Sequence, residues 1–303
     1  MKLLFNDAYY KYLDYIKYRQ KLQSIKVLKE RFSNCILPYW KDYDIYSITD
    51  NDYINWQNFI EDRNYSNNYK CGLHYLMSGF FEYCVNYLSL SFNYSKRVGC
   101  FKLKNVKVKH DYYTCSEFKK FIKGFDNNVY KLFFITMFIT GLRPGETMAL
   151  KFSDLSKYQL SIDKSISEHS FDGTRIIDTP KSFSSIRTVK ITKKLYNSLI
   201  KLKSSYGSLD KDLYIFGGIK PLSPTTINRY KINACNKVGI RSIKLHEFRH
   251  SHASLLYDIN TPIQFIKNRL GHSNITTTMD VYVHLNNKKE KRVLHKLNFL
   301  KIF

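Results

Sequence analysis

The spacing of apolar residues changes along this chain of 303 residues, and that change restricts the folds that it can adopt. In residues 1–95, apolar and aromatic side chains recur every three or four positions, which is the period of an amphipathic helix. Residues 54–60 and 69–90 keep this character, and Leu37-Pro38-Tyr39 marks a break between helices. The clearest series is Phe5, Tyr9, Tyr12, Leu13 and Ile16. The first part of the chain is therefore predicted to be a small helical bundle.

The rest of the chain mixes helical and strand-like spacing. A capping box of Thr114 and Glu117 predicts the start of a helix, and helical spacing continues to residue 150. Alternating stretches that are typical of strands follow at residues 159–166, 175–178 and 187–191. Helices return from Thr192, at residues 223–238, from His246 onward and at residues 262–270, where Pro262 suits a first turn. We expect a mainly α fold with a small antiparallel β-sheet, as a helical bundle followed by an α+β domain.

Positive charge is spread along the whole chain. Lys+Arg number 49 against 25 for Asp+Glu, which gives a formal net charge of +24. Such a surplus provides either a self-repelling, soluble surface or phosphate neutralisation, and it favours nucleic acid as the partner. The six cysteines form no C-x-x-C pair and indicate reduced thiols in a cytosolic protein. The most apolar run, residues 132–142, is about half of a membrane span, so no membrane segment is predicted.

A basic stretch joins the two parts of the chain. Cations alternate there with apolar residues: Lys96, Arg97, Lys102, Lys104, Lys107, Lys109 and His110. Two interpretations remain open. The stretch is either an extended linker at residues 96–112 that lies along DNA, with Lys102, Lys104, Lys107 and Lys109 at phosphates, or an edge strand decorated with lysine.

A set of cations and one tyrosine hydroxyl follow one another in the second half of the chain: Arg143, Lys181, His246, Arg249, His272 and Tyr282. Charge in a phosphodiester transition state builds on the non-bridging oxygens, and fixed Arg and His donors can hold it without a metal. A phenol with a pKa of about 10 is a usable nucleophile only where cations or a base offset the cost of ionising it. The series therefore predicts an enzyme that breaks and rejoins DNA through Tyr282. Neither a metal nor another cofactor is expected, and no phosphate-binding loop for ATP is present.

Five segments in one order carry a resemblance to a known family. They are residues 140–146 (TGLRPGE), 179–182 (TPKS) with 185–189 (SIRTV), 245–254 (LHEFRHSHAS), 270–273 (LGHS) and 276–282 (TTTMDVY). Together they resemble the boxes of the tyrosine recombinases, or phage-integrase family. The sequences of these boxes are similar in style to those of integrases from phages, genomic islands and conjugative transposons of low-GC Gram-positive bacteria.

The resemblance assigns a role to each residue of the series. Arg143 and Arg249 would hold the non-bridging oxygens of the scissile phosphate, and Glu146 would orient the arginine and the histidine box. Lys181, on a hairpin tip, would protonate the departing 5′ oxygen. His246 would accept the tyrosine proton or bond the phosphate, and His272 would donate a further hydrogen bond to it. Tyr282 would form a covalent 3′-phosphotyrosine.

The resemblance also implies domains and partners. Residues 1–95 would be a core-binding DNA clamp, 113–290 the catalytic domain, and 291–303 a tail that docks on a neighbouring protomer. The expected partner is double-stranded DNA at attachment sites, bound by a homotetramer in the cytoplasm at the nucleoid. An excisionase and a host DNA-bending protein are candidate accessory partners. Many relatives carry a further amino-terminal domain for arm sites; the chain starts at the core-binding region, which leaves arm-site binding open.

Three alternatives use the same residues differently. A Xer-like chromosome or plasmid resolvase would share the whole series, and a DNA-binding regulator on the same fold would bind without cleaving. Residues 246–250 also spell H-E-x-x-H, the signature of zinc proteases. Arg249 would then place a cation beside the metal, and the other four boxes would have no explanation, so the zinc interpretation is disfavoured.

Overall fold

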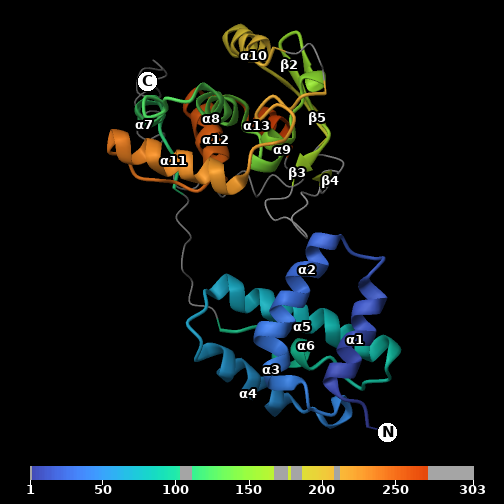
Figure 1. Ribbon diagram of the computed structural model, residues 1–303. Coiled ribbons are helices and arrows are strands. Elements are labelled where there is room, and N and C mark those ends of the chain that lie inside the picture. The colour runs from blue at the N-terminus through green and yellow to red at the C-terminus, as the bar shows by residue number, and fades with distance from the viewer. Residues whose placement is uncertain (1, 103–110, 167–176, 179–185, 208–211, 272–303) are drawn as a thin grey trace, which may run out of the picture. The chain divides into compact units, whose positions relative to one another are not determined.

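The computed structural model describes residues 2–102, 111–166, 177–178, 186–207 and 212–271, and the chain divides into two compact units, Met1–Lys107 and Val108–Phe303 (Figure 1). Several predicted positions lie outside the described residues: Lys104, Lys107, Lys109, Lys181, His272, Tyr282 and the tail at 291–303. Each unit has a hydrophobic core of its own.

The N-terminal unit is a helical bundle, as its apolar spacing predicted. Its helices are α1 (Phe5–Ile16), α2 (Leu22–Arg31), the π-helical turn η1 (Phe32–Ile36), α3 (Leu37–Trp40), the 3₁₀ turn η2 (Ile45–Ser47), α4 (Asp50–Glu61), α5 (Asn67–Tyr87) and α6 (Tyr94–Val98). Aromatic rings fill its core. The ring of Phe5 on α1 lies 4.6 Å from that of Phe80 on α5 and 5.6 Å from that of Trp40 on α3. Burial of such rings supplies much of the bundle's hydrophobic stabilisation.

The break expected at Leu37-Pro38-Tyr39 is a π-helical turn and does not separate two helices by a loop. The backbone N–H of Leu37 donates to the carbonyl of Phe32, five residues earlier, and the helical backbone continues into α3. Pro38 then falls in the first turn of α3. Proline has no N–H to donate, and the N–H groups in the first turn of a helix have no acceptor within that helix. Pro38 therefore removes no hydrogen bond of α3, and the wider π-helical turn before it gives its ring room.

The prediction of an extended linker that begins at residue 96 is wrong for the first residues of that stretch. Lys96 and Arg97 belong to α6, which ends at Val98 and is followed by the C-cap residue Gly99 with a φ of 87°. Lys96 pairs with Glu82 at 2.6 Å and Arg97 with Asp50 at 2.8 Å, so carboxylates of the bundle hold these cations on its surface. Lys102 is exposed, and the path of the chain from residue 103 to 110 is outside the described residues. For that part, the linker remains a prediction.

The second unit combines helices with antiparallel strands, as expected, but its described strands form two small sheets where one was predicted. Its elements are α7 (Cys115–Ile122), α8 (Asn128–Thr140), α9 (Pro144–Ala149), η3 (Phe152–Asp154), β1 (Leu155–Ser156), β2 (Gln159–Ile162), β3 (Ser165–Ile166), β4 (Ile177–Asp178), β5 (Arg187–Lys190), α10 (Lys193–Ser205), α11 (Pro224–Val238), α12 (Glu247–Asp258) and α13 (Ile263–Leu270). One sheet has the order β1-β2-β5, and the other pairs β3 with β4. The predicted capping box of Thr114 and Glu117 opens α7 and is confirmed.

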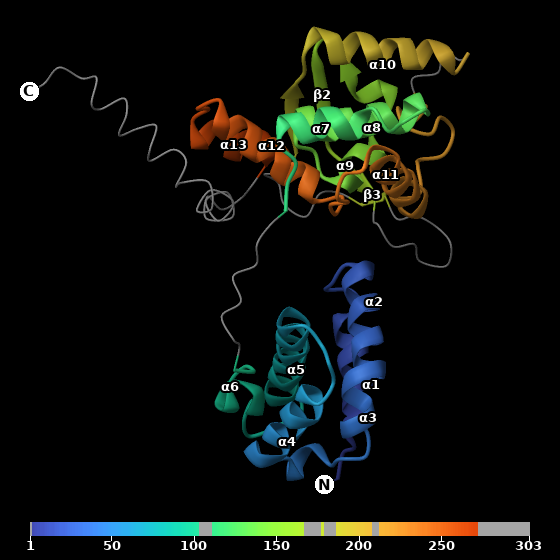
Figure 2. The same cartoon turned by 90° about the vertical axis from the view of Figure 1, so that its left-hand side faces the viewer.

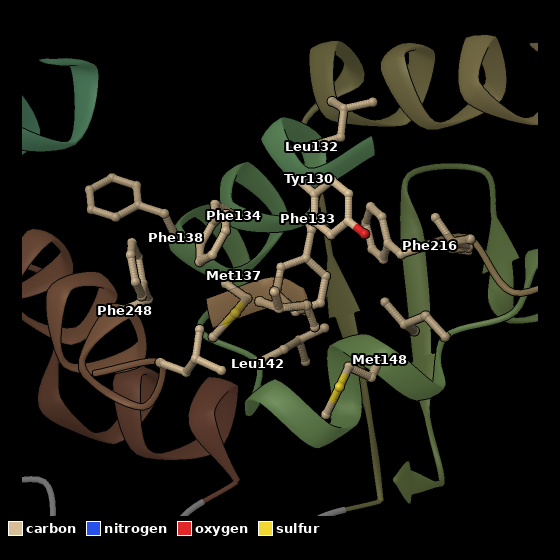
Figure 3. Packing of buried hydrophobic residues seen from close by; sticks show 14 of the residues in the cluster. Tyr130, Leu132, Phe133, Phe134, Met137, Phe138, Leu142, Met148, Phe216 and Phe248 are labelled. Carbon is tan, nitrogen blue, oxygen red and sulfur yellow. The ribbon is translucent and has the colours of Figure 1, made fainter. Parts of the chain in front are cut away.

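The core of the second unit is built around α8. In two views α8 lies between α10 on one side and α12 on the other, and the close view shows its rings meeting Phe248 of α12 (Figures 1–3). The rings of Phe134 and Phe248 are 4.9 Å apart. Because α8 is covered on opposite sides, it is apolar nearly all round, which explains the run that resembled half of a membrane span. None of the described helices is long and apolar enough to cross a membrane.

The end of α8 is fixed by Gly141, which starts the segment that carries Arg143. Gly141 has a φ of 71°, a left-handed conformation that favours glycine. A Cβ atom here would also lie 2.4 Å from the ring of His252 on α12. The tight crossing of α8 and α12 therefore requires glycine for two reasons, and it sets where the next residues begin.

Candidate active site

Arg143 occupies the N-cap position of α9, directly before Pro144 in the first turn. Its backbone N–H donates to Oε2 of Glu146 at 2.8 Å, and its Nη1 donates to Oε1 of the same carboxylate at 2.8 Å. The backbone and side chain of Arg143 are thus held by one residue of the same turn. The side chain of Arg143 keeps about a third of its surface exposed, at 34%.

Glu146 is buried, and a second arginine shares its carboxylate. Arg187 on β5 donates from Nη1 to Oε1 at 3.0 Å and from Nη2 to Oε2 at 2.9 Å. Burial alone raises the pKa of the Glu146 carboxyl, but the hydrogen bonds and charge of Arg187, followed by those of Arg143, lower that pKa to about 2. The carboxylate is therefore ionised at any physiological pH.

Arg249 lies in the first turn of α12 and is 1% exposed. Its Nη1 donates to the carbonyl of Gly141 at 2.9 Å and its Nη2 to that of Leu270 at 2.6 Å. Its Nε is buried and has no hydrogen-bond partner among the residues that the structure describes. Burial, followed by the positive charge of Arg143, lowers the pKa of Arg249 well below its usual value. Three guanidinium groups face one carboxylate here, so the cluster keeps a surplus of positive charge.

The three arginines meet at the C-terminal end of α13. Three consecutive backbone carbonyls there accept hydrogen bonds from the three arginines. The carbonyl of Arg269 accepts from Nε of Arg187 at 2.9 Å, and that of Leu270 accepts from Nη2 of Arg249 at 2.6 Å. The carbonyl of Gly271 accepts from Nη2 of Arg143 at 3.4 Å. The last carbonyls of a helix have no partner within the helix and carry the negative end of its dipole, which favours cations. His272 is the next residue in the sequence, outside the described range.

A buried histidine and a fourth arginine hold α13 against the rest of the unit. Nδ1 of His252 lies 2.8 Å from the carbonyl of Phe138, so this nitrogen donates, and Nε2 accepts from Nε of Arg269 at 3.1 Å. Arg269 also donates to the carbonyls of Lys190 on β5 and Ile139 on α8, each at 3.1 Å. Burial, followed by the charge of Arg269, lowers the pKa of His252 to about 3, so its ring is neutral.

His246 is exposed at the start of α12, three residues before Arg249. Its ring lies 5.2 Å from the ring of His250 in an edge-on arrangement. Glu247, between them, accepts the backbone N–H of Lys244 at 2.6 Å. Within the described parts of the chain, no group of three or more His, Cys, Asp or Glu side chains is placed to hold a metal ion.

The structure brings together Arg143, Glu146 and Arg249 of the predicted site and adds Arg187, to which the sequence pattern had given no role. A signal for Arg187 was present. In the predicted strand, Arg187 shares one face with the apolar residues Val189 and Ile191, so the alternation places an arginine on a face expected to be buried, where it requires a buried acceptor. Lys181, His272 and Tyr282 lie outside the described residues, and their roles remain predictions.

A mixed α/β unit that gathers arginines around one ionised carboxylate is the kind of site that binds an oxyanion such as a DNA phosphate. Residues 114–289 match the phage integrase family, and residues 4–60 match the N-terminal SAM-like domain of phage integrases. The chain therefore belongs to the phage integrase family of tyrosine recombinases, as its five boxes predicted.

Individual relatives agree with this assignment. The chain is 33% identical over 280 residues to the ICEBs1 integrase of Bacillus subtilis, a match that covers 88% of this chain and 74% of the relative. It is 28% identical to a XerC-like tyrosine recombinase of Caldanaerobacter subterraneus, over 75% of this chain and 65% of the relative.

Solved structures share the fold. The Tn1549 transposon integrase in complex with transposon right-end DNA superposes with a TM-score of 0.75 at 16% identity, over 98% of this chain and 100% of that chain. A λ integrase dimer bound to a core site gives a TM-score of 0.70 at 19% identity, over 92% and 77%. The expected fold class, a helical bundle followed by an α+β integrase domain, is confirmed.

Proposed function

We propose that this chain integrates and excises a mobile element by cutting and rejoining DNA at specific sites. The observation that carries the proposal is the meeting of Arg143, Arg249 and Arg187 at the end of α13, one residue before His272. This cluster has more positive charge than Glu146 neutralises, and Arg249 carries a buried N–H without an acceptor in the described residues. A phosphate between Arg143 and Arg249 would supply both the missing charge and an acceptor.

In the proposed reaction, the Tyr282 oxygen attacks the scissile phosphorus. A bond forms between the phenol oxygen and phosphorus, and the bond to the 5′ oxygen breaks. His246 accepts the phenol proton, Lys181 protonates the departing 5′ oxygen, and His272 donates a hydrogen bond to a non-bridging oxygen. The 5′-hydroxyl of a partner strand then reverses the step. One phosphate ester replaces another, so the chemistry requires neither ATP nor a metal.

We infer that the working form is a homotetramer on two DNA sites. In support, λ integrase, which shares this fold, has been solved as a tetramer bound to a Holliday junction. The exposed Lys102, with Lys104, Lys107 and Lys109, would neutralise phosphates next to the core-binding unit. The substrate is cellular DNA, so we place the enzyme in the cytoplasm at the nucleoid, with an excisionase and a DNA-bending protein as accessory partners.

A second candidate is a Xer-like resolvase, which is favoured by the similarity to the XerC-like recombinase. The chemistry would be the same, and only the DNA sites would differ. An assay on two substrates separates the two functions: one carries the ends of the DNA segment in which the gene lies, and the other carries a chromosomal dimer-resolution site. Recombination of the chromosomal site alone would favour the resolvase.

The decisive experiment for the chemistry uses a duplex with those segment ends and a nick close to the cleavage point. The short fragment between the cleavage point and the nick, which carries the released 5′-hydroxyl, then diffuses away, and a covalent protein–DNA adduct accumulates. The wild-type chain should form this adduct in the presence of a metal chelator. Tyr282→Phe should bind the duplex with wild-type affinity and form no adduct. Binding by the wild type without any adduct would support the non-cleaving regulator, and an adduct with Tyr282→Phe would move the nucleophile elsewhere.

A further inference from the structure

Arg187 connects two parts of the arginine cluster that are distant in the sequence. It lies on β5, with 8% of its side chain exposed, and binds the carboxylate of Glu146 on α9 through both Nη atoms. Its Nε donates to the carbonyl of Arg269 at the end of α13. One planar side chain thus fixes the distance between the Glu146 carboxylate and the helix end that the other arginines bind.

We propose that Arg187 is a positioning residue for DNA cleavage: it neutralises Glu146 so that the charge of Arg143 is available to the scissile phosphate. This inference rests on the proposed function. Arg187 does not itself touch the phosphate, because it is nearly buried and directs three of its donors at Glu146 and Arg269.

Charge counting explains why one arginine beside Glu146 is not enough. Arg143 and Glu146 alone sum to zero charge, and such a pair attracts an anion weakly. Arg187 adds a second cation to the same carboxylate, so the three groups together carry one positive charge. Glu146 can therefore hold Arg143 in place through two hydrogen bonds while the phosphate meets a net cation.

The position of Arg187 also joins the sheet to the site. β5 pairs with β2 along its whole length, with Ile162 opposite Arg187. Arg269, whose carbonyl accepts from Arg187, donates in turn to the carbonyl of Lys190 at the other end of β5. β5 and the end of α13 are thereby linked twice.

The test measures adduct formation by full-length variants on the same nicked duplex. A second duplex carries a neutral methylphosphonate at the scissile position, which removes one negative non-bridging oxygen. The variants are Arg187→Met, Arg187→Lys and the double variant Arg187→Met with Glu146→Gln. The matched control is Arg241→Lys, since Arg241 also binds a carboxylate, Asp111, through Nε at 3.0 Å and 3.1 Å. Its side chain is 44% exposed, and its ion pairs are with Asp111 and Glu117, outside the arginine cluster.

Arg187→Met should slow adduct formation on the phosphate duplex by about 100-fold, the scale of losing one donor to a transition state, while DNA affinity stays unchanged. The loss should be at least about ten-fold smaller on the methylphosphonate, since less charge has to be held. The double variant should recover part of the rate because it no longer has the Glu146 carboxylate that would neutralise Arg143. The rate of Arg187→Lys should fall between those of Arg187→Met and the wild type. Arg241→Lys should react like the wild type.

Three outcomes would each overturn the charge-sharing role. The first is that Arg187→Met loses the same factor in the rate of adduct formation on both duplexes. The others are a double variant slower than Arg187→Met and a folded Arg187→Lys as slow as Arg187→Met. Wild-type rates for Arg187→Met would overturn it as well. If Arg187→Met does not fold, Arg187→Lys on the two duplexes decides the question in the same way. A wild-type chain that forms no adduct would instead refute the proposed function, which keeps the two failures separate.

Discussion

Acid is expected to destabilise the second unit through one buried histidine. His252 is 2% exposed and neutral, and it donates to the carbonyl of Phe138 while accepting from Arg269. A proton on Nε2 would remove that acceptor and place a second cation against Arg269, with Arg249 also nearby. Since Arg269 ties α13 to α8 and β5, breaking its hydrogen bond to His252 would loosen the helix end that the arginine cluster binds.

The size and sign of the effect follow from the pKa. The pKa of His252 is about 3 in the folded chain and about 6.5 in an unfolded one. Between these values the unfolded chain binds one more proton, so the free energy of unfolding falls as the pH falls. The loss from pH 7.5 to 5.5 is about 1.4 kcal/mol, which corresponds to a melting temperature lower by about 3–6 °C for a unit of this size. Glu146 does not contribute in this window: its stabilisation is complete above the unfolded pKa of about 4.5 and is lost only as the pH falls towards 2.

The measurement compares the wild type with His252→Gln by thermal unfolding at several pH values from 7.5 to 5.5. Glutamine offers a donor group, its NH2, and an acceptor group, its carbonyl, in place of the donor and acceptor nitrogens of the neutral histidine, but it does not titrate. The variant is expected to be less stable at pH 7.5 and to lose about 1.4 kcal/mol less than the wild type on acidification. Parallel pH dependence in the two proteins would refute the assignment of a neutral, buried His252.

Three further predictions concern the chemistry and the binding of DNA. Arg143→Lys keeps the charge but loses the two-point fork, so the rate of adduct formation should fall by about two orders of magnitude with little change in binding; near-full activity would rule out the fork. A bridging 5′-phosphorothiolate, whose sulfur leaves without a proton, should rescue Lys181→Ala much more than Arg143→Ala, and equal rescue would remove Lys181 from the acid role. Neutralising Lys102, Lys104, Lys107 and Lys109 together should flatten the slope of log affinity against log salt by up to about 0.9 for each phosphate that the protein no longer neutralises, whereas an unchanged slope would favour the edge strand.

Local features of this protein were predictable from the sequence because they depend on residues a few positions apart. The spacing of Phe5, Tyr9 and Tyr12 predicts α1, and Thr114 with Glu117 predicts the start of α7. The pairing of Arg143 with Glu146 is equally local, since the two residues are three positions apart in one turn. The five boxes likewise identified the family without any knowledge of the fold.

The tertiary structure decided the features that depend on distant partners. Arg187 is 41 positions from Glu146, and Arg249 is 108 positions from the carbonyl of Gly141 that it binds. No local pattern states which buried acceptor such a cation will meet, because that depends on how α9, α12, α13 and β5 pack. The same reason explains the error at Lys96, whose position on a helix is held by Glu82 of α5. The sequence by itself determined which residues could serve the chemistry; only the packing of the helices and the sheet determined that the charge of Glu146 is shared by two arginines.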